Sequence, residues 1–168
     1  MRLLAFCKRL TETMSRKDIF KAIIYARTSR DSENDLTIDE QIDRCMEFAD
    51  QTSKNICVVD VVADQGFEGI ALQRPGFNKI MELLMAGEAD CILVDDICRV
   101  SSNLLELAYL MVDILPELEA DMFFEGVSVD SDTPEHSYES LMRVLEIYSE
   151  ARGVDEVHIN DVDMHYVR

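Results

Sequence analysis

Short apolar runs alternate along most of this chain with segments whose apolar residues recur at helical spacing. The runs, each typical of a buried strand, are Ala22–Arg27, Ile56–Ala63, Cys91–Val94 and Met122–Phe124. The helical segments cover about residues 36–49, 75–84, 102–115 and 134–152. Because strands that alternate with helices pair in parallel, this order predicts an α/β domain with a mostly parallel sheet and helices on both faces.

Individual residues mark where the predicted helices begin and end. Thr37 and Glu40 have the spacing of a capping box, which starts a helix. Pro75 suits the first turn of the second helix, and Gly87 suits its end. The third helix is expected to stop at Pro116, since proline cannot continue a helical hydrogen-bond ladder.

The length of 168 residues fits one domain, and no Gly/Ser-rich or Pro-rich tract marks a linker. We expect an N-terminal extension over residues 1–20, a domain over 21–152 and a short tail over 153–168. Met14 is an alternative start, because it lies just ahead of the first strand. The tail is too short for a helix-turn-helix and carries one arginine, so no DNA-binding domain is expected in it.

The net charge of -18 argues against strong, independent binding of nucleic acid, since Lys and Arg supply most of the affinity for a phosphate backbone. No Lys or Arg occurs from Val100 to Met142, a stretch rich in Asp and Glu. We expect a solvated acidic surface, and DNA binding that is weak and falls steeply as salt rises.

The cysteines and the hydropathy pattern bear on the compartment. The five cysteines are odd in number and form no Cys-x-x-Cys, which favours a reducing compartment, the cytoplasm, over a disulfide or zinc framework. The apolar run Leu3–Cys7 is too short for a signal peptide, and no stretch approaches the ~20 apolar residues of a membrane span.

Three arginines follow the predicted strands, where parallel sheets place their ligands. They are Arg27 after the first strand, Arg74 after the second and Arg99 after the third, with Ser29 two residues beyond Arg27. Tyr25 shares a strand face with Arg27. Arginines that converge on a hydroxyl suit phosphoryl transfer, because guanidinium donors bind phosphate oxygens and stabilise charge in the transition state. The alternative to a phosphate site is that the three arginines are scattered and have separate structural roles.

Five segments, in order, resemble motifs of the serine recombinases, the family of resolvases, invertases and large serine integrases. Tyr25-Ala-Arg27-Thr-Ser29 resembles the Tyr-x-Arg-x-Ser signature of that family. The others are Leu36–Gln41, Asp64–Gly69 with Arg74-Pro75-Gly76, Ala89–Val94 with Arg99-Val-Ser101, and Phe123–Thr133. The resemblance covers about residues 20–152 and implies a resolvase-like three-layer fold with a long C-terminal dimer helix.

The resemblance also implies a chemistry. Ser29 would attack a DNA phosphodiester, form a 5′-phosphoserine link and release a 3′ hydroxyl. Arg27, Arg74 and Arg99 would bind the scissile phosphate, and Tyr25 and Gln41 would support the site. No metal or nucleotide cofactor would be needed, because strand exchange conserves the bond energy.

The chain departs from the family pattern at two positions. Cys98 and Ser102 stand where the family has the Asp and the last Arg of Asp-Arg-Leu-Ser-Arg. Asp95 and Asp96 lie just ahead, and strand alternation lets at most one of them face the site. A carboxylate ~4 Å from a phosphate would oppose its binding by about 4 kcal/mol at an effective dielectric of about 20. A magnesium site at these aspartates would leave the arginines unexplained.

Two functions therefore stay open. The first is a recombinase catalytic domain, whose DNA is delivered by another subunit or a lost domain. The second is a non-catalytic relative, either an interaction or regulatory partner or a mobile-element remnant.

The segment 134–152 bears on assembly, because it carries an apolar stripe. The stripe consists of Tyr138, Leu141, Met142, Leu145 and Tyr148. With the apolar helix before it, this segment predicts a homodimer, or a heterodimer with an intact recombinase.

Overall fold

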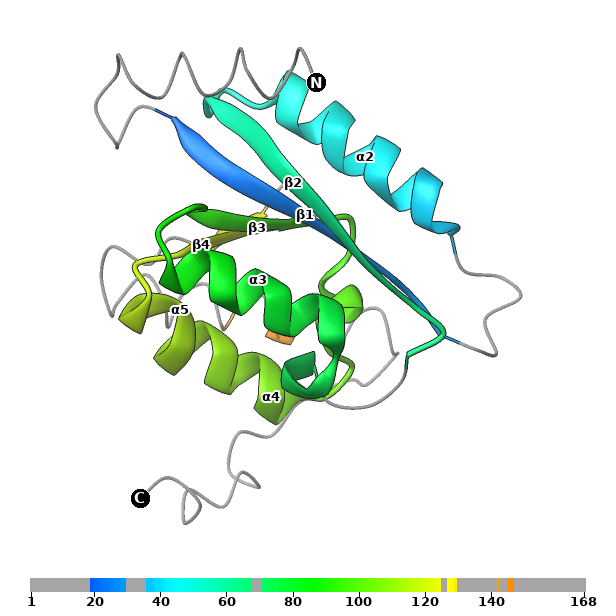
Figure 1. The fold of residues 1–168 in the computed structure, drawn as a ribbon, viewed down its shortest axis with the longest axis vertical. Coiled ribbons are helices and arrows are strands. Elements are labelled where there is room, and N and C mark those ends of the chain that lie inside the picture. Colours follow the sequence, from blue (N-terminus) through cyan, green and yellow to red (C-terminus); the bar gives the residue numbers. More distant parts are fainter. Residues whose placement is uncertain are drawn as a thin grey trace.

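A computed structural model describes residues 19–29, 36–67, 71–124 and 127–129, together with the single positions 142, 145 and 146. Apart from those three positions, the predicted helix over 134–152 lies outside the described residues, as do the tail over 153–168 and almost all of the extension over 1–20. The described residues form a sheet with helices packed on it (Figure 1).

A five-stranded sheet forms the centre of the fold, in the order β2-β1-β3-β4-β5. The strands are β1 (Phe20–Thr28), β2 (Ile56–Gln65), β3 (Cys91–Val94), β4 (Asp121–Phe124) and β5 (Val127–Val129). The first four run parallel, and β5 pairs antiparallel with β4. The predicted mostly parallel sheet is confirmed, while β5 is an addition that the sequence did not indicate.

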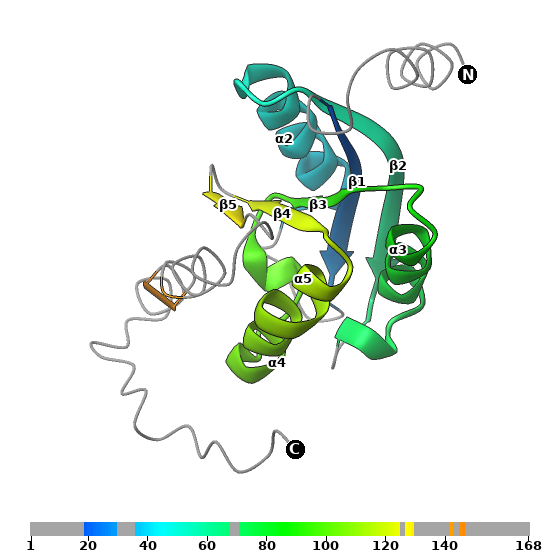
Figure 2. The same ribbon diagram turned by 90° about the vertical axis from the view of Figure 1, so that its left-hand side faces the viewer.

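Helices cover both faces of the sheet, as Figures 1 and 2 show. Helix α2 (Ile38–Gln51) packs on one face, where Cys45, Ile42 and Met46 meet Ala22, Ile24 and Leu93. The other face carries α3 (Pro75–Met85) and the continuous helical segment α4 (Leu104–Tyr109), η3 (Leu110–Ile114) and α5 (Leu115–Glu117). Alternate residues of β1 supply both cores, which explains its uninterrupted apolar sequence.

The local signals at the helix ends are largely confirmed. Thr37 and Glu40 form the complete capping box of α2, Pro75 opens α3, and Gly87 has a φ of 67° just beyond the end of α3. The predicted stop at Pro116 is wrong, because the helix continues to Glu117. In the π-helical turn η3, the Leu115 N–H donates to the Leu110 carbonyl. A new α-helical segment, α5, then begins at Leu115, and Pro116 lies in its first turn, where proline is tolerated.

Across the described ranges, no helix is long and apolar enough to cross a membrane.

Candidate functional site

The site lies at the edge of the sheet where β1, β2 and β3 end. Arg27 is the second-last residue of β1 and is paired in register with Asp64 of β2. Ser29 directly follows β1 and is half-buried. The short 3-10 helices η1 (Ala71–Gln73) and η2 (Ile97–Arg99) precede Arg74 and follow β3, respectively. The strand ends thus bring the segments that carry the predicted site residues to one edge.

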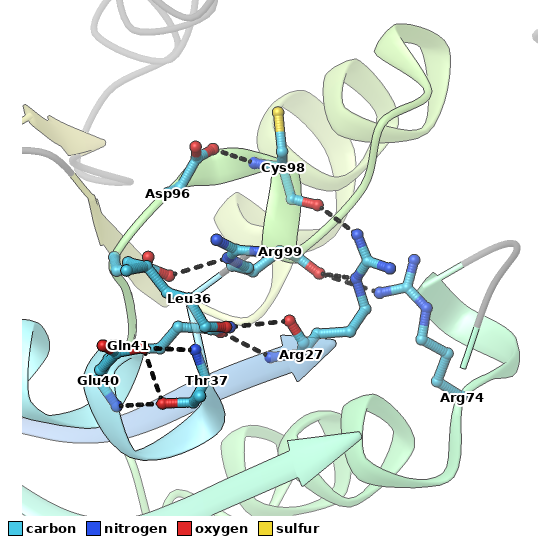
Figure 3. Close-up of polar contacts among 10 residues, drawn as sticks. Arg27, Leu36, Thr37, Glu40, Gln41, Arg74, Asp96, Cys98 and Arg99 are labelled. Atoms are coloured by element: carbon cyan, nitrogen blue, oxygen red, sulfur yellow. Dashed lines mark hydrogen bonds and ion pairs between the residues drawn. The ribbon is translucent and has the colours of Figure 1, made fainter. Parts of the chain in front are cut away.

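The Arg27 side chain binds backbone carbonyls on both sides of this edge. Its Nε donates to the Arg99 carbonyl at 3.0 Å, and Nη2 donates to the Cys98 carbonyl at 2.9 Å (Figure 3). Its Nη1 donates to the carbonyl of Phe67, in the loop after β2, at 3.3 Å. These bonds fix the guanidinium between the segments that follow β2 and β3.

Arg74 is buried, with 2% of its surface exposed, and its Nη1 lies among three oxygen acceptors. It donates to the Tyr25 hydroxyl at 3.2 Å, the Arg99 carbonyl at 3.1 Å and the Val100 carbonyl at 2.7 Å. Arg27 and Arg74 therefore meet at a single atom, the carbonyl oxygen of Arg99, although one arginine comes from β1 and the other precedes α3 (Figure 3).

Asp64 joins Tyr25 to the start of α3. The Tyr25 hydroxyl donates to Asp64 Oδ2 at 2.9 Å, and the same carboxylate accepts the backbone N–H of Gly76 at 2.9 Å and of Phe77 at 3.2 Å. Burial raises the pKa of Tyr25 to about 12, so its hydroxyl stays a donor at neutral pH. In the sequence, Asp64 belongs to a motif segment but not to the predicted site residues; its place at the end of β2 is the signal that could have pointed to its role.

Gln41 ties the end of β1 to α2. Its Oε1 accepts the backbone N–H of Arg27 at 2.9 Å, and its Nε2 donates to the carbonyls of Arg27 at 3.0 Å and Leu36 at 2.8 Å (Figure 3). The side chain is fully buried. Gln41 therefore pairs with the Arg27 backbone as a neighbouring strand would, which fixes the direction of the chain just before Ser29.

The Arg99 side chain takes a different direction from its carbonyl. Its Nε donates to Asp95 Oδ1 at 3.2 Å, and the two side chains are 9% and 2% exposed, respectively. Burial raises the pKa of the Asp95 carboxyl, while the Arg99 guanidinium acts in the opposite sense. The neighbouring Asp96 carboxylate accepts the Cys98 N–H at 2.7 Å and thereby caps η2.

Glu106 of α4 is a further residue that the sequence analysis missed. Its carboxylate accepts the backbone N–H of Ala71, in η1, and the hydroxyl of Ser101. Ala71 lies three residues before Arg74, and Ser101 follows Val100, whose carbonyl Arg74 binds. No signal in the sequence pointed to this link, because Glu106 has the spacing of an ordinary acidic residue in the first turn of a helix.

Comparison with known proteins decides the family. A sequence model described as the resolvase N-terminal domain matches residues 22–156, four fifths of the chain. This chain belongs to the resolvase family. No curated protein sequence matches it significantly.

Solved structures agree with this assignment to the resolvase family. The N-terminal catalytic domain of TP901-1 integrase is 26% identical, with a TM-score of 0.59, over 81% of this chain and 99% of that one. A resolvase family site-specific recombinase from Streptococcus pneumoniae is 22% identical, with a TM-score of 0.56, over 80% of this chain and 91% of that one. The similarity to the Streptococcus pneumoniae recombinase shows a shared fold alone, whereas the similarity to TP901-1 integrase extends to the sequence as well.

The two departures from the resolvase family pattern lie within η2 and just after it. Cys98 is half-buried within η2, where its carbonyl binds Arg27, and Ser102 is exposed ahead of α4. In the described part of the chain, no group of three or more His, Cys, Asp or Glu side chains is placed to hold a metal ion.

Proposed function

We propose that this chain is a serine recombinase catalytic domain that cleaves and rejoins DNA through a phosphoserine intermediate at Ser29. One observation carries the proposal: the Arg27 and Arg74 guanidinium groups both donate to the Arg99 carbonyl. Arg27 lies near the end of β1, the strand that Ser29 directly follows. Two guanidinium groups at one oxygen acceptor, one of them two residues before a serine, match the needs of phosphoryl transfer.

The proposed reaction is a transesterification without a cofactor. The Ser29 Oγ forms a bond to phosphorus, the bond from phosphorus to the 3′ oxygen breaks, and the serine proton is passed on to that leaving oxygen. Arg27 and Arg74 bind the non-bridging oxygens, which carry charge and accept hydrogen bonds more strongly than the carbonyls that orient these side chains in the described structure. Tyr25 and Gln41 hold the surrounding backbone and hydroxyl groups in place.

Replacing Ser29 by alanine is expected to abolish the covalent adduct without unfolding the domain, because Ser29 is a half-buried residue outside the core clusters. The assay uses a pool of duplexes with randomised centres, labelled at their 3′ ends, since a 5′-phosphoserine keeps the 3′ part of the cut strand. A denaturing gel then separates labelled protein from DNA. Equal adduct from wild-type and Ser29→Ala chains would contradict the proposal.

A second candidate function rests on the Arg99–Asp95 ion pair together with Cys98 and Ser102. An arginine neutralised by a buried carboxylate, at a site that lacks an aspartate and an arginine of the family pattern, suits a non-catalytic interaction or regulatory partner, or a mobile-element remnant. Such a protein would fold and assemble but give no adduct on any DNA.

DNA is the proposed substrate, bound weakly by this chain alone because its net charge is -18. The cytoplasm is the proposed compartment. Two buried free cysteines support it: burial raises the pKa of Cys45 to about 12 and raises the pKa of Cys91 well above its ordinary value, which keeps both in the thiol form.

We also propose a dimer, either of two copies or with an intact recombinase. Three apolar side chains on one stripe of the α4–η3 segment support it: Leu105 is 60% exposed, Tyr109 50% and Val112 43%. Their spacing of four and three residues places them on one side of the helix, where a second chain could cover them.

Light scattering at micromolar concentration is expected to give twice the chain mass of 19.2 kDa. Leu145→Glu and Tyr109→Glu should each give a monomer, because each places a charge in the proposed interface. Met85→Glu is the matched control: Met85 is a 64% exposed apolar residue on α3, and its replacement should leave the dimer intact. A clean monomer mass for the wild-type chain would exclude the homodimer.

A further inference from the structure

The guanidinium of Arg99 lies apart from those of Arg27 and Arg74. Figure 3 shows it pointing away from both of them, although they share the Arg99 carbonyl as an acceptor. It forms instead the ion pair with Asp95, whose side chain is only 2% exposed. Because little water reaches this pair, its charges attract each other more strongly than a surface pair would.

The alternation of β3 explains why Asp95 draws Arg99 to this place. Ile92 and Val94 lie on the face of the sheet that α3 covers, and Cys91 and Leu93 lie on the face that α2 covers. The next residue, Asp95, continues toward α2, where its charge acts on Cys45. Tyr25 and Arg74 meet on the opposite face, with α3. The ion pair thus separates the third arginine from the other two.

We propose that Asp95 is a positioning residue that holds the Arg99 guanidinium on the α2 side and competes with a bound phosphate for it. This inference rests on the proposed function, since it takes a phosphate as the ligand of the arginines. Leaving a buried carboxylate without its cation is costly, so a phosphate that recruits Arg99 must overcome that cost. A neutral residue at position 95 would remove the competitor, and phosphate would bind more tightly.

Asp96 provides a matched control for this effect. It carries the same charge one residue along, but its carboxylate caps η2 by accepting the Cys98 N–H. Asparagine caps helices about as well as aspartate, so Asp96→Asn preserves the turn and removes one negative charge. Asp95→Asn removes the same charge and keeps the side-chain shape, but weakens the bond to Arg99, because a neutral acceptor binds a guanidinium less strongly than a carboxylate does.

The test is a titration with inorganic phosphate, followed by the NMR signals of the arginine Nε–H groups. Asp95→Asn is expected to lower the Kd for phosphate about tenfold and to shift the Arg99 signal on binding. Asp96→Asn should change the Kd less than about twofold. An unchanged Kd in Asp95→Asn, or an equal decrease in both variants, would overturn the proposal.

Two further measurements complete the test. The first uses the wild-type chain, so it does not depend on whether a variant folds. At phosphate concentrations that shift the Nε–H signals of Arg27 and Arg74, the Arg99 Nε–H signal should stay in place. A shift of all three signals together would overturn the inference. The same titrations in a Ser29→Ala background should give the same tenfold difference, because phosphate binding needs no bond to Ser29. This result would stand even if no DNA adduct formed, so the two proposals fail separately.

Discussion

Replacing Arg74 by alanine is expected to destabilise the fold by about 3–5 kcal/mol and to abolish the DNA adduct. The guanidinium is buried and donates to the Tyr25 hydroxyl and to the carbonyls of Arg99 and Val100. A buried acceptor that loses its donor costs about 1–3 kcal/mol. The Tyr25 hydroxyl and the Val100 carbonyl lose the Arg74 donor, while the Arg99 carbonyl keeps its bond from Arg27. These losses share one side chain, so they do not simply add. The adduct is lost as well, because Arg74 is one of the two guanidinium groups at the shared carbonyl.

Urea unfolding followed by circular dichroism measures this effect. Lys79→Ala is the matched control, since Lys79 is a cation on the same helix, α3, but forms an exposed ion pair with Asp60. Exposed pairs contribute about 0–1 kcal/mol, so this variant should unfold close to the wild-type midpoint. Similar losses in the two variants would show that Arg74 is not the buried anchor described above.

Replacing Gly76 by alanine is expected to cost about 2–4 kcal/mol. A Cβ at Gly76 would lie 2.8 Å from Cγ, Oδ1 and Oδ2 of Asp64, closer than real Cβ atoms approach other atoms. The carboxylate cannot simply move aside, because the Tyr25 hydroxyl and the N–H groups of Gly76 and Phe77 hold it in place. The cost combines overpacking with weakened hydrogen bonds.

A double-mutant cycle isolates this clash. Asp64→Ala destabilises the fold by itself, but it also empties the space that the new Cβ needs. We therefore expect Gly76→Ala to cost less than about 1 kcal/mol in the Asp64→Ala background, a coupling of at least about 1 kcal/mol. Denaturant unfolding of the four chains gives the coupling. An equal cost of Gly76→Ala in both backgrounds would exclude the contact with Asp64 as its cause.

The four parallel strands could be predicted from the sequence because their signals are local, whereas β5 could not. The apolar run from Ala22 to Tyr25 supplies both cores by alternation, and Thr37 with Glu40 starts α2 through bonds within four residues. The end of the helical segment that begins with α4 was harder to predict. It depends on the π-helical turn before Pro116, in which backbone N–H groups bond to a carbonyl five residues back instead of four, and sequence spacing does not reveal that difference.

The site could be predicted in part. Strand ends placed Arg27 and Arg74 at one edge, since parallel strands end together. The direction of the Arg99 side chain could not be predicted, because it depends on a buried carboxylate four residues away and on the rotamers of a 3-10 turn. Glu106 was missed for a related reason: its partners lie in a loop and a turn that only the folded chain brings to α4.

Ser29 is the proposed nucleophile, and mass spectrometry of the adduct tests this role most directly. After reaction with the randomised duplexes, nuclease digestion leaves a nucleotide on the protein, and cleavage before aspartates yields the peptide Asp18–Arg30. We expect the nucleotide mass on this peptide, with fragment ions that place it on Ser29. A nucleotide on Thr28 or on another peptide, or a wild-type chain without any adduct, would contradict it.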